Sequence, residues 1–440
     1  MAQSALRIGV AGVGTVGSAL VRILDEKAAA LAERCGRPMA VTGVSARDRN
    51  RDRGCDLSKV AWFDTPGELA ASGDIDVFVE LIGGEGDPAY SAVKQALETG
   101  KHVVTANKAL LARHGVELAR MAEEKGLILN FEAAVAGGIP IIKTMREALT
   151  SNDVFRVYGI LNGTCNYILT RMEDEGLSYD ACLSQAQALG YAEADPTFDV
   201  EGNDTAHKLA ILTSLAFGCE ISADDIYVEG ISNITVEDIE AARDMGYRIK
   251  LLGVAQKTAS GIEQRVHPTM VPMRAPIAQI AGVTNAVAIE ADIVGQLVLS
   301  GPGAGGNATA SAVSGDLCDI AKSRPGHQIA PALGKPAGLL SPYKRAAMRA
   351  HAGGYFIRLT VHDQTGVFAS IASRMAEQDI SLASIVQRRK NGAADGKGDG
   401  SQTIILITHE TTEQAIRNAL EKIEQDGHLA APSQMIRLEH

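Results

Sequence analysis

Short apolar runs alternate with helical patterns over the first third of the chain. Runs that predict strands cover residues 6–11, 39–44, 76–82, 101–108 and 127–132, and helical patterns cover 88–98 and 110–125. The run 76–82 is apolar almost throughout, which is typical of a parallel strand covered on both faces. Strands that alternate with helices predict βαβ units. We therefore expect a doubly wound, Rossmann-type domain at the N-terminus.

The middle of the chain also contains strand patterns and helix patterns, but in a different order. Strands are predicted over 155–161, 249–256, 264–268, 286–289 and 296–300, and helices over 141–149, 166–175, 180–190, 203–217 and 308–321. Strands that follow one another without intervening helices favour an antiparallel sheet. We expect a second, α+β domain, with the helix at 308–321 returning the chain to the first domain.

The C-terminal part follows the order β-α-β-β-α-β. Strands are predicted over 355–361, 380–387, 403–408 and 433–438, with helices ending at 377 and 424 and a polar loop at 391–401. This order is that of a small ferredoxin-like domain. The proline- and glycine-containing segment before it is interpreted as a linker.

These patterns divide the chain into three domains, all of the α/β class. The predicted boundaries are 1–134 with the return helix at about 305–322 for the first domain, 135–304 for the second, 323–353 for the linker and 354–440 for the third.

Composition narrows the class of protein. The chain has 440 residues, 46% of them hydrophobic and 22% charged, and a net charge of −11. The acidic balance argues against general binding to nucleic acid or membrane surfaces. No apolar run has the length of a membrane span, no signal peptide is visible, and the six cysteines form no C-x-x-C pair, so a reducing cytoplasm is expected. Residues 438–440 resemble a tag remnant and are given no structural weight.

A glycine motif lies where the first predicted strand passes into a helix. Its residues are Gly12, Val13, Gly14, Thr15, Val16 and Gly17. In such a motif the first glycine forms the turn, the second lets a pyrophosphate approach the backbone, and the third lets helix and strand pack. The helix N-terminus favours the phosphates. The motif therefore predicts a dinucleotide site.

The second predicted strand ends in a basic segment. NAD-specific sites usually have a carboxylate there to hold the ribose 2′-hydroxyl. Ser45 and Ala46 stand in that place, and Arg47 and Arg49 follow. Two arginines suit a 2′-phosphate, so the pattern favours NADP with Arg47 as a contact. The alternative is that 47–53 is only a solvated basic loop.

Carboxylates and a lysine gather between residues 190 and 208. Glu193 lies in a loop that follows Gly190, and Asp199 precedes the predicted helix 203–217. Asp204 and Lys208 share one face of that helix, one turn apart. This constellation suits binding of an amino acid and transfer of a proton. Alternatively, Asp204 and Lys208 form an ordinary surface pair.

Three further segments have residues that suit ligand binding. Asn107 and Lys108 follow the strand at 101–108, at the end of the sheet where ligands bind, and are expected to face the nicotinamide. The segment 135–140 predicts a tight turn whose carbonyls can hold a hard cation. The glycine loop 301–306 is either a second cofactor contact, through Gly303 and Gly305, or only a turn that returns the chain.

With these motifs in place, the chain resembles a bacterial homoserine dehydrogenase along essentially its whole length. The matching stretches are GVGTVG, TANKAL, FEAAVAGGIP, GILNGTCNYIL and GYAEADPTFDVEGNDTAHKLAIL. The last stretch is long and highly specific. The C-terminal domain resembles an ACT module, with Asp363, Gly366 and Val367 at its strand–helix turn. The resemblance is to the monofunctional type, without an aspartokinase portion.

The resemblance implies roles for individual residues. Lys208 is expected to exchange a proton with the reacting oxygen, and Lys108 to contact cofactor and substrate. Glu193 and Asp204, with Asp199 beside them, are expected to bind the substrate, and Gly190 to lie against the cofactor. A sodium ion is expected on the backbone carbonyls of Glu132, Val135, Gly137 and Ile139. Cys165 stands where the family usually has threonine, and it is only a weak candidate for a catalytic cysteine.

The implied reaction is the NADP- or NAD-dependent reduction of L-aspartate 4-semialdehyde to L-homoserine. A lysine serves as the proton donor if burial lowers its pKa from about 10.4 towards neutrality. The family also implies feedback by threonine and a homodimer or homotetramer.

Two alternatives remain open. One is an amino-acid sensor without activity. The other is a different NADP-dependent semialdehyde oxidoreductase, whose acylating chemistry needs an activated cysteine.

Overall fold

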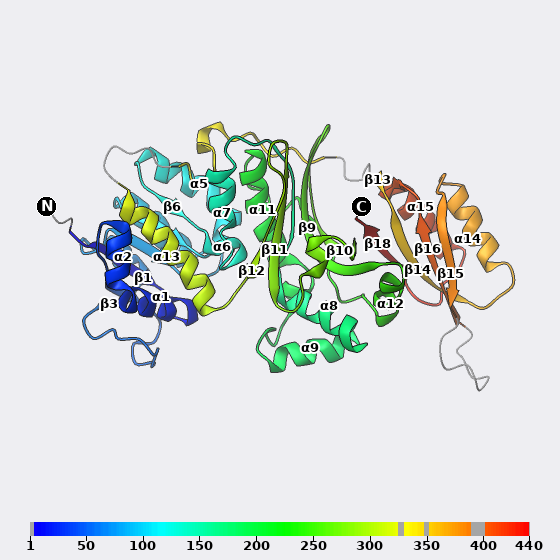
Figure 1. The fold of residues 1–440 in the computed structure, drawn as a ribbon, viewed down its shortest axis with the longest axis horizontal. Coiled ribbons are helices and arrows are strands. Elements are labelled where there is room, and N and C mark those ends of the chain that lie inside the picture. Colours follow the sequence, from blue (N-terminus) through cyan, green and yellow to red (C-terminus); the bar gives the residue numbers. More distant parts are fainter. Residues whose placement is uncertain (1–3, 324–329, 347–351, 389–400, 440) are drawn as a thin grey trace.

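The computed structural model describes residues 4–323, 330–346, 352–388 and 401–439. Figure 1 shows three parts in a row along the long axis, from the N-terminal domain in blue to the C-terminal module in orange and red. None of the helices in these described ranges has both the length and the apolar character that a bilayer span requires.

A parallel sheet forms the N-terminal domain, as predicted, but it has six strands, because the edge strand β3 (Ala61–Phe63) joins the five that were predicted. Its strands are β1 (Leu6–Ala11), β2 (Met39–Ser45), β3 (Ala61–Phe63), β4 (Val77–Glu80), β5 (His102–Thr105) and β6 (Leu129–Asn130). The order is β3-β2-β1-β4-β5-β6, and every pair is parallel. The order reverses between β1 and β4, and ligands of such sheets bind at the carboxyl ends of the strands beside this reversal.

Helices cover both faces of this sheet. They are α1 (Thr15–Glu26), α2 (Ala28–Cys35), α3 (Pro66–Ala71), α4 (Ala89–Glu98), α5 (Lys108–Glu124) and the returning α13 (Gly306–Lys322). Val313 and Leu317 of α13 share a core with Ile8 and Val10 of β1. The apolar stripe of α13 therefore draws the chain back to the first domain after the second is complete.

The middle domain is a sheet covered by helices. Its strands are β7 (Val154–Ile160), β8 (Tyr227–Val228), β9 (Tyr247–Thr258), β10 (Gly261–Pro272), β11 (Thr284–Ala291) and β12 (Gly295–Pro302). The path β12-β11-β7-β9-β10 is antiparallel throughout, as predicted, and β8 joins β10 in parallel.

The helices of this domain differ greatly in length. They are α6 (Ala133–Ala136), α7 (Ile141–Lys143), the π-helical η1 (Thr144–Ala148), α8 (Gly163–Glu175), α9 (Tyr179–Ala188), α10 (Thr197–Val200), α11 (Asn203–Phe217), α12 (Val236–Asp244), and the 3-10 turns η2 (Pro276–Gln279) and η3 (Ala337–Leu339). Helix α11 has the predicted bounds. Its residues 209–214 are buried without interruption because it lies between the two domains.

Two predictions about residues 135–149 are confirmed only in part, with a turn at 137–139 and a helical segment over 141–148. The expected turn at 135–140 begins as the helical turn α6, and the chain reverses only at Gly137, whose φ is +54°. A Cβ on Gly137 would lie 2.4 Å from the Gly303 carbonyl oxygen, so neighbouring backbone fixes the reversal there. The single helix expected over 141–149 is α7 followed by η1, where the Leu149 N–H bonds to the Thr144 carbonyl five residues earlier.

The C-terminal module has the predicted β-α-β-β-α-β order. Its elements are β14 (Tyr355–His362), α14 (Val367–Ala376), β15 (Leu382–Arg388), β16 (Ser401–Thr408), α15 (Glu413–Gln425) and β18 (Gln434–Leu438), with the short pair β13 (Ala352–Gly353) and β17 (Thr411–Thr412). The antiparallel order is β18-β14-β16-β15. The predicted loop 391–401 lies outside the described residues except for Ser401, which begins β16.

The C-terminal strand joins this module to the middle domain. Strand β18 pairs with β14 on one side and runs parallel to β10 on the other, so one sheet is continuous through both parts. The Glu439 N–H donates to the Met270 carbonyl, and the Glu439 carboxylate lies 2.6 Å from Arg156. The prediction that 438–440 have no structural weight is therefore wrong for Leu438 and Glu439. His440 lies outside the described residues.

The described part of the predicted linker, 330–346, follows the surface of the first two parts. Ser341 forms a bridge with Cys219, and Arg345 forms one with Ile262. The Ala337 N–H donates to the Glu123 carboxylate at 2.8 Å. This stretch is therefore fixed along its length.

Candidate active site

Helix α11 begins at a glycine that its surroundings require. Gly202 has φ +87°, and a Cβ there would lie 2.9 Å from Val266 and 3.0 Å from Val228. Asp204 follows in the first helical turn, where the helix dipole favours a negative charge. This start places Asp204 and Lys208 on the face of α11 that meets the N-terminus of α5.

Asp204 bridges two lysines. Its Oδ2 accepts a hydrogen bond from Lys208 Nζ at 2.7 Å, and its Oδ1 lies 3.0 Å from Lys108 Nζ. Lys208 Nζ also donates to the Leu161 carbonyl at 2.7 Å. The Asp204 and Lys208 side chains are only 7% and 12% exposed, so they are not the ordinary surface pair of the alternative interpretation.

The charges around Asp204 decide its ionisation. Burial alone would raise the pKa of Asp204, but the Lys208 and Lys108 ammonium groups outweigh burial and hold the pKa below its ordinary value. At Asp199, burial and the charge of Asp204 raise the pKa, while a hydrogen bond from Asn162 opposes them. The cluster therefore holds one firmly ionised carboxylate beside a second that ionises less readily.

Asn162 links the two carboxylates, and sequence reasoning missed it. Its Nδ2 donates to Asp199 at 2.8 Å and to Asp204 at 2.9 Å, and its Oδ1 accepts from the Cys165 N–H as the N-cap of α8. In the sequence, Asn162 stands only between the predicted strand 155–161 and the predicted helix 166–175. An asparagine at that junction is a signal for capping, but its contacts with distant carboxylates depend on the fold.

Asn285 is a second residue that the sequence did not single out. Its Nδ2 donates to the Leu161 carbonyl at 3.0 Å, so this carbonyl accepts from both Asn285 and Lys208. A Cβ on Gly303 would lie 2.0 Å from the Asn285 amide, so only glycine fits at 303. At Gly303 the backbone passes so close to Asn285 that no side chain can be accommodated.

Glu193 lies in the loop that follows α9. Gly190, with φ +75°, closes that helix, and Thr164 Oγ1 donates to the Tyr191 carbonyl at 2.6 Å. The Glu193 side chain is exposed, and it makes no ion pair with any residue in the described ranges. The loop thus begins beside α8 and presents Glu193 to solvent.

Cys165 lacks the setting of a reactive thiol. It is fully buried, and burial, followed by the charges of Asp199 and Asp204, raises the pKa of its thiol. Its Sγ lies 3.2 Å from the Asp199 carbonyl. The acylating chemistry of the alternative oxidoreductase needs an activated cysteine, and Cys165 is not one.

The glycine motif has the close contacts that a dinucleotide site requires. A Cβ on Gly12 would lie 2.4 Å from the Leu81 carbonyl oxygen, and a Cβ on Gly17 would lie 2.2 Å from the Gly12 carbonyl oxygen. No atom of the described residues lies within 4 Å of a Cβ on Gly14, so this residue borders open space. The free N–H groups of α1 begin there, as a pyrophosphate requires.

A second helix N-terminus lies beside the glycine motif. Gly305, with φ +110°, precedes α13, and a Cβ on Gly306 would lie 3.0 Å from the Thr15 side chain. The N-termini of α1 and α13 are therefore neighbours. Their dipoles together favour an anion in front of Gly14 and Gly305.

The basic segment after β2 contacts the glycine motif through Arg53. Arg53 Nε donates to the Val13 carbonyl at 3.1 Å, and its guanidinium lies 5.3 Å from the centre of the Trp62 ring. Arg49 lies over the same ring at 5.8 Å, whereas Arg47 is exposed. Sequence reasoning named Arg47 and missed Arg53.

The loops after β4 and β5 are fixed by Glu80. This fully buried carboxylate accepts from the Ile82 and Gly83 N–H groups at 2.7 and 3.0 Å and from Thr105 Oγ1 at 2.5 Å. Asn107 caps α5 through the Leu110 N–H at 3.0 Å. Lys108, the first residue of α5, is thereby held at the carboxyl end of the sheet.

The segment expected to hold sodium offers carbonyl oxygens, and one of the four, that of Ile139, already accepts a hydrogen bond. The Glu132 side chain accepts from the Ile142 and Lys143 N–H groups, both at 2.8 Å, and the Ile139 carbonyl accepts from the Ile141 N–H at 2.8 Å. Val135 lies in α6, and Gly137 is at the reversal that follows. Oxygen atoms are the donors that hard cations prefer. Within the described ranges, no cluster of His, Cys, Asp and Glu side chains suits a metal ion.

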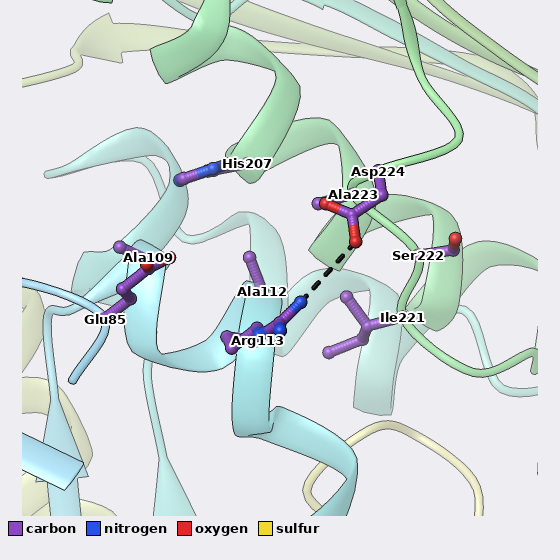
Figure 2. Close-up of a pocket in the computed structure, with 9 residues that line it drawn as sticks. All are labelled: Glu85, Ala109, Ala112, Arg113, His207, Ile221, Ser222, Ala223 and Asp224. Carbon is purple, nitrogen blue, oxygen red and sulfur yellow. Dashed lines mark ion pairs between the residues drawn. The ribbon is translucent and has the colours of Figure 1, made fainter.

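A cavity of about 390 Å³ lies next to the lysine–aspartate cluster. Figure 2 shows that its walls come from α5, from His207 of α11 and from residues 221–224 that follow α11. In the sequence, Ala109 directly follows Lys108 and His207 directly precedes Lys208. Arg113 and Asp224 form an ion pair across it at 3.5 Å. Burial and the neighbouring Lys108 lower the pKa of His207.

The three regulatory candidates lie where the sequence placed them. Gly366, with φ +94°, is the N-cap of α14, and Val367 is its buried first residue. Asp363 is exposed in the turn that follows β14. Asp363, Gly366 and Val367 therefore lie in the turn between β14 and α14, as the sequence predicted.

The fold and the site define a class of protein. A doubly wound domain with a dinucleotide motif meets a buried Lys-Asp-Lys cluster that can donate a proton. These features are those of an NAD(P)-dependent oxidoreductase.

Family models match all three parts of the chain. Residues 12–132 match the homoserine dehydrogenase NAD-binding domain, 140–318 match homoserine dehydrogenase and 355–427 match the ACT domain. The homoserine dehydrogenase of Pseudomonas aeruginosa is 44% identical over 99% of both chains. That of Neisseria gonorrhoeae is 42% identical over 99% of this chain and 98% of the relative. The chain belongs to the homoserine dehydrogenase family.

Solved structures agree with this assignment. The homoserine dehydrogenase of Thiobacillus denitrificans has a TM-score of 0.92 and 41% identity over 99% of this chain and 98% of that one. A hyperthermophilic archaeal homoserine dehydrogenase in complex with NADPH has a TM-score of 0.62 and 28% identity over 73% of this chain and 98% of that one. The protein interconverts L-aspartate 4-semialdehyde and L-homoserine.

Proposed function

We propose that Lys208 transfers the proton in this reaction. The observation that supports it most is the position of Lys208 Nζ, held between the Leu161 carbonyl and Asp204 Oδ2, both at 2.7 Å. An ammonium group has three N–H donors, so one remains for the substrate oxygen. Bound NAD(P)H supplies the hydride to the aldehyde carbon. Lys208 donates a proton to the oxygen as charge develops there.

Lys108 keeps the Asp204 charge balanced while Lys208 changes protonation. When Lys208 has given up its proton, Asp204 still faces the Lys108 ammonium at 3.0 Å. Without that second cation a buried carboxylate would stand unpaired, which is costly. Lys108 also lies at the strand end where the nicotinamide is expected, so it can contact both cofactor and substrate.

Glu193, Asp199 and Asp204 form the proposed binding site for the substrate's ammonium group. Asn162 orients Asp199 and Asp204 towards each other. Glu193 reaches the substrate if the exposed loop after Gly190 closes over it. Gly190 borders the cofactor at the same time.

We infer that NADP is the preferred cofactor and that NAD also binds. Ser45 ends β2 in place of a carboxylate, and Arg47, Arg49 and Arg53 follow it. Arg53 contacts the glycine motif itself. The archaeal relative solved with NADPH is consistent with this preference.

Sodium is proposed on the carbonyls of Glu132, Val135, Gly137 and Ile139. The oxygen-only donor set around the Gly137 reversal supports this assignment. The ion would hold the segment that joins the first two domains.

Threonine is the proposed effector of the ACT module.

A homodimer or homotetramer is the proposed assembly. Phe155, Ile293 and Val294 are exposed apolar residues at the end of the middle sheet where Val154 of β7 pairs with Ala291 of β11, and the Val294 N–H donates to Asn152 Oδ1 at 3.0 Å. An exposed apolar patch at the end of the middle sheet suits contact with a second copy.

The assay of this function follows the absorbance of reduced nicotinamide during homoserine oxidation with NADP or NAD. Faster turnover with NADP than with NAD is the expected result, because the arginines favour the 2′-phosphate. Faster turnover with NAD would keep the reaction and remove the arginines from cofactor selection. An absence of turnover with both cofactors would contradict the proposed roles of Lys208 and Lys108.

A further inference from the structure

One histidine beside the active site has no role in the proposed mechanism. His207 directly precedes Lys208 on α11 and lines the cavity of about 390 Å³ between α5 and residues 221–224, which we call the α5–α11 cavity. Neither ring nitrogen of His207 has a hydrogen-bond partner among the described residues, and Nδ1 is in addition buried. Because no hydrogen bond holds the ring, both nitrogens remain available to exchange a proton.

The charges around His207 keep its ring neutral. Burial, followed by the Lys108 ammonium on α5, lowers the pKa of His207 below its ordinary value of 6.5. Asp204 on α11, Glu85 in the loop after β4 and Asp224 after α11 oppose this shift. The imidazole is therefore neutral at neutral pH. A neutral imidazole accepts a proton at one nitrogen and donates one from the other.

The α5–α11 cavity opens to solvent beside an exposed ion pair. Arg113 and Asp224 lie 3.5 Å apart, and their side chains are 63% and 90% exposed, so the pair does not seal the opening. Figure 2 shows His207 and Glu85 on one side of the cavity and the Arg113–Asp224 pair on the other. Water and small polar molecules can therefore reach His207.

Lys208 itself has poor access to solvent. Its side chain is only 12% exposed, and its Nζ is held by the Leu161 carbonyl and Asp204 Oδ2. Lys108, on the other oxygen of Asp204, is 32% exposed and directly precedes Ala109 in the cavity wall. Homoserine oxidation leaves a proton on Lys208, which must lose it before the next turnover. The hydrogen-bonded way out leads through Asp204 and Lys108 towards the cavity.

We propose that His207 carries this proton from the lysine–aspartate cluster to solvent. In homoserine oxidation the hydride passes to NAD(P)⁺ and the hydroxyl proton passes to Lys208 Nζ. Lys108 gives a proton to His207 through water in the cavity, and Asp204 passes the proton of Lys208 to the amine left on Lys108. His207 then releases its proton to water. Each turnover thus frees one proton and restores all four side chains, and reduction runs the same steps in reverse.

This inference rests on the proposed role of Lys208, and it makes His207 a relay residue that does not touch the substrate. Steady-state oxidation of homoserine by full-length His207→Gln tests it, because glutamine is polar but cannot change protonation. We expect kcat to fall at least about tenfold, with KM for homoserine unchanged. Imidazole, added at constant pH and ionic strength, should enter the cavity and restore most of the lost rate. The wild type should not respond to imidazole.

The matched control is His114→Gln, the same change on α5 outside the cavity. His114 directly follows Arg113, and its ring stacks on Tyr90 at 4.1 Å between ring centroids. This variant should have the kcat of the wild type and no response to imidazole. Thermal unfolding of both variants checks that the fold is intact.

Three results would overturn the proposal. One is a wild-type kcat in His207→Gln. Another is a lowered kcat that imidazole does not raise, which would leave His207 only as a packing partner of the Phe198 ring, 5.5 Å away. The third is an equal response to imidazole in His114→Gln. A failure of the proposed function is distinguishable, because it shows as absent turnover in the wild type or as near-normal kcat in Lys208→Ala.

Discussion

At the scale of single residues, the site depends on one carboxylate that serves two cations. Asp204 is buried, and this costs free energy unless its charge is compensated. Lys208 and Lys108 provide that compensation from two different domains of the chain. The sequence predicted Asp204 and Lys208 as a pair on one helix face. It could not reveal that Lys108 completes the pair, because that contact joins residues far apart in the chain.

Asn162 provides a residue-scale prediction that separates capping from site geometry. Asn162→Ser keeps an oxygen that can cap α8 but removes the amide that donates to Asp199 and Asp204. We expect kcat to fall about 10²-fold because the two carboxylates lose their shared donor. The free energy of unfolding should change little, as measured by urea denaturation.

The matched control is Asn162→Ala, which loses both functions of the side chain. It should show the same loss of kcat and, in addition, about 1 kcal/mol lower stability. Full activity in the serine variant would show that Asn162 is only a helix cap.

At the scale of elements, the turns before helices determine where the side chains of the site lie. Helix α11 was predicted with its observed bounds because the helical spacing of its residues is a local signal. The short helix α6 and the π-helical η1 were not predicted; α6 ends at Gly137, whose form depends on contact with the distant Gly303. The local sequence pattern therefore predicted the long helix well and the short, tightly packed helices poorly.

Two glycines at helix ends have similar backbone angles, and they allow a prediction about stability. Gly202 and Gly190 have φ of +87° and +75°, but only Gly202 is enclosed by side chains. Gly190→Ala should cost about 1–2 kcal/mol from the left-handed backbone alone. Gly202→Ala should cost about 2–5 kcal/mol, because its Cβ also meets Val266 and Val228.

Urea unfolding of both glycine variants measures this difference directly. Homoserine oxidation should also fall in Gly202→Ala, because α11 starts at that residue. Equal stability losses in the two variants would contradict the described packing around Gly202.

At the scale of the whole molecule, a single sheet joins the middle domain to the ACT module. The sequence predicted both sheets but not their union, since the parallel pairing of β18 with β10 joins residues more than a hundred positions apart. The last described residue takes part in this union through Arg156. The ACT module is thus built into the edge of the middle domain.

Glu439 provides the prediction at this scale. Glu439→Gln should lower the free energy of unfolding by about 1–3 kcal/mol, because the largely buried Arg156 loses the negative charge at 2.6 Å and Glu290 at 3.5 Å is then its charged partner. Thermal unfolding by calorimetry measures the loss. Glu424→Gln, on an exposed face of α15, is the control and should have no effect. A stability equal to that of the wild type would show that the C-terminal end contributes little to the junction.

The central claim is that Lys208 transfers the proton, and steady-state kinetics of two variants test it most directly. Lys208→Ala should lose about 10²–10⁴-fold in kcat with cofactor affinity unchanged. Lys208→Arg keeps the positive charge, but its guanidinium cannot give up a proton, so kcat should fall similarly. Near-normal kcat in Lys208→Arg would reduce Lys208 to an electrostatic role. Near-normal kcat in Lys208→Ala would contradict the claim altogether.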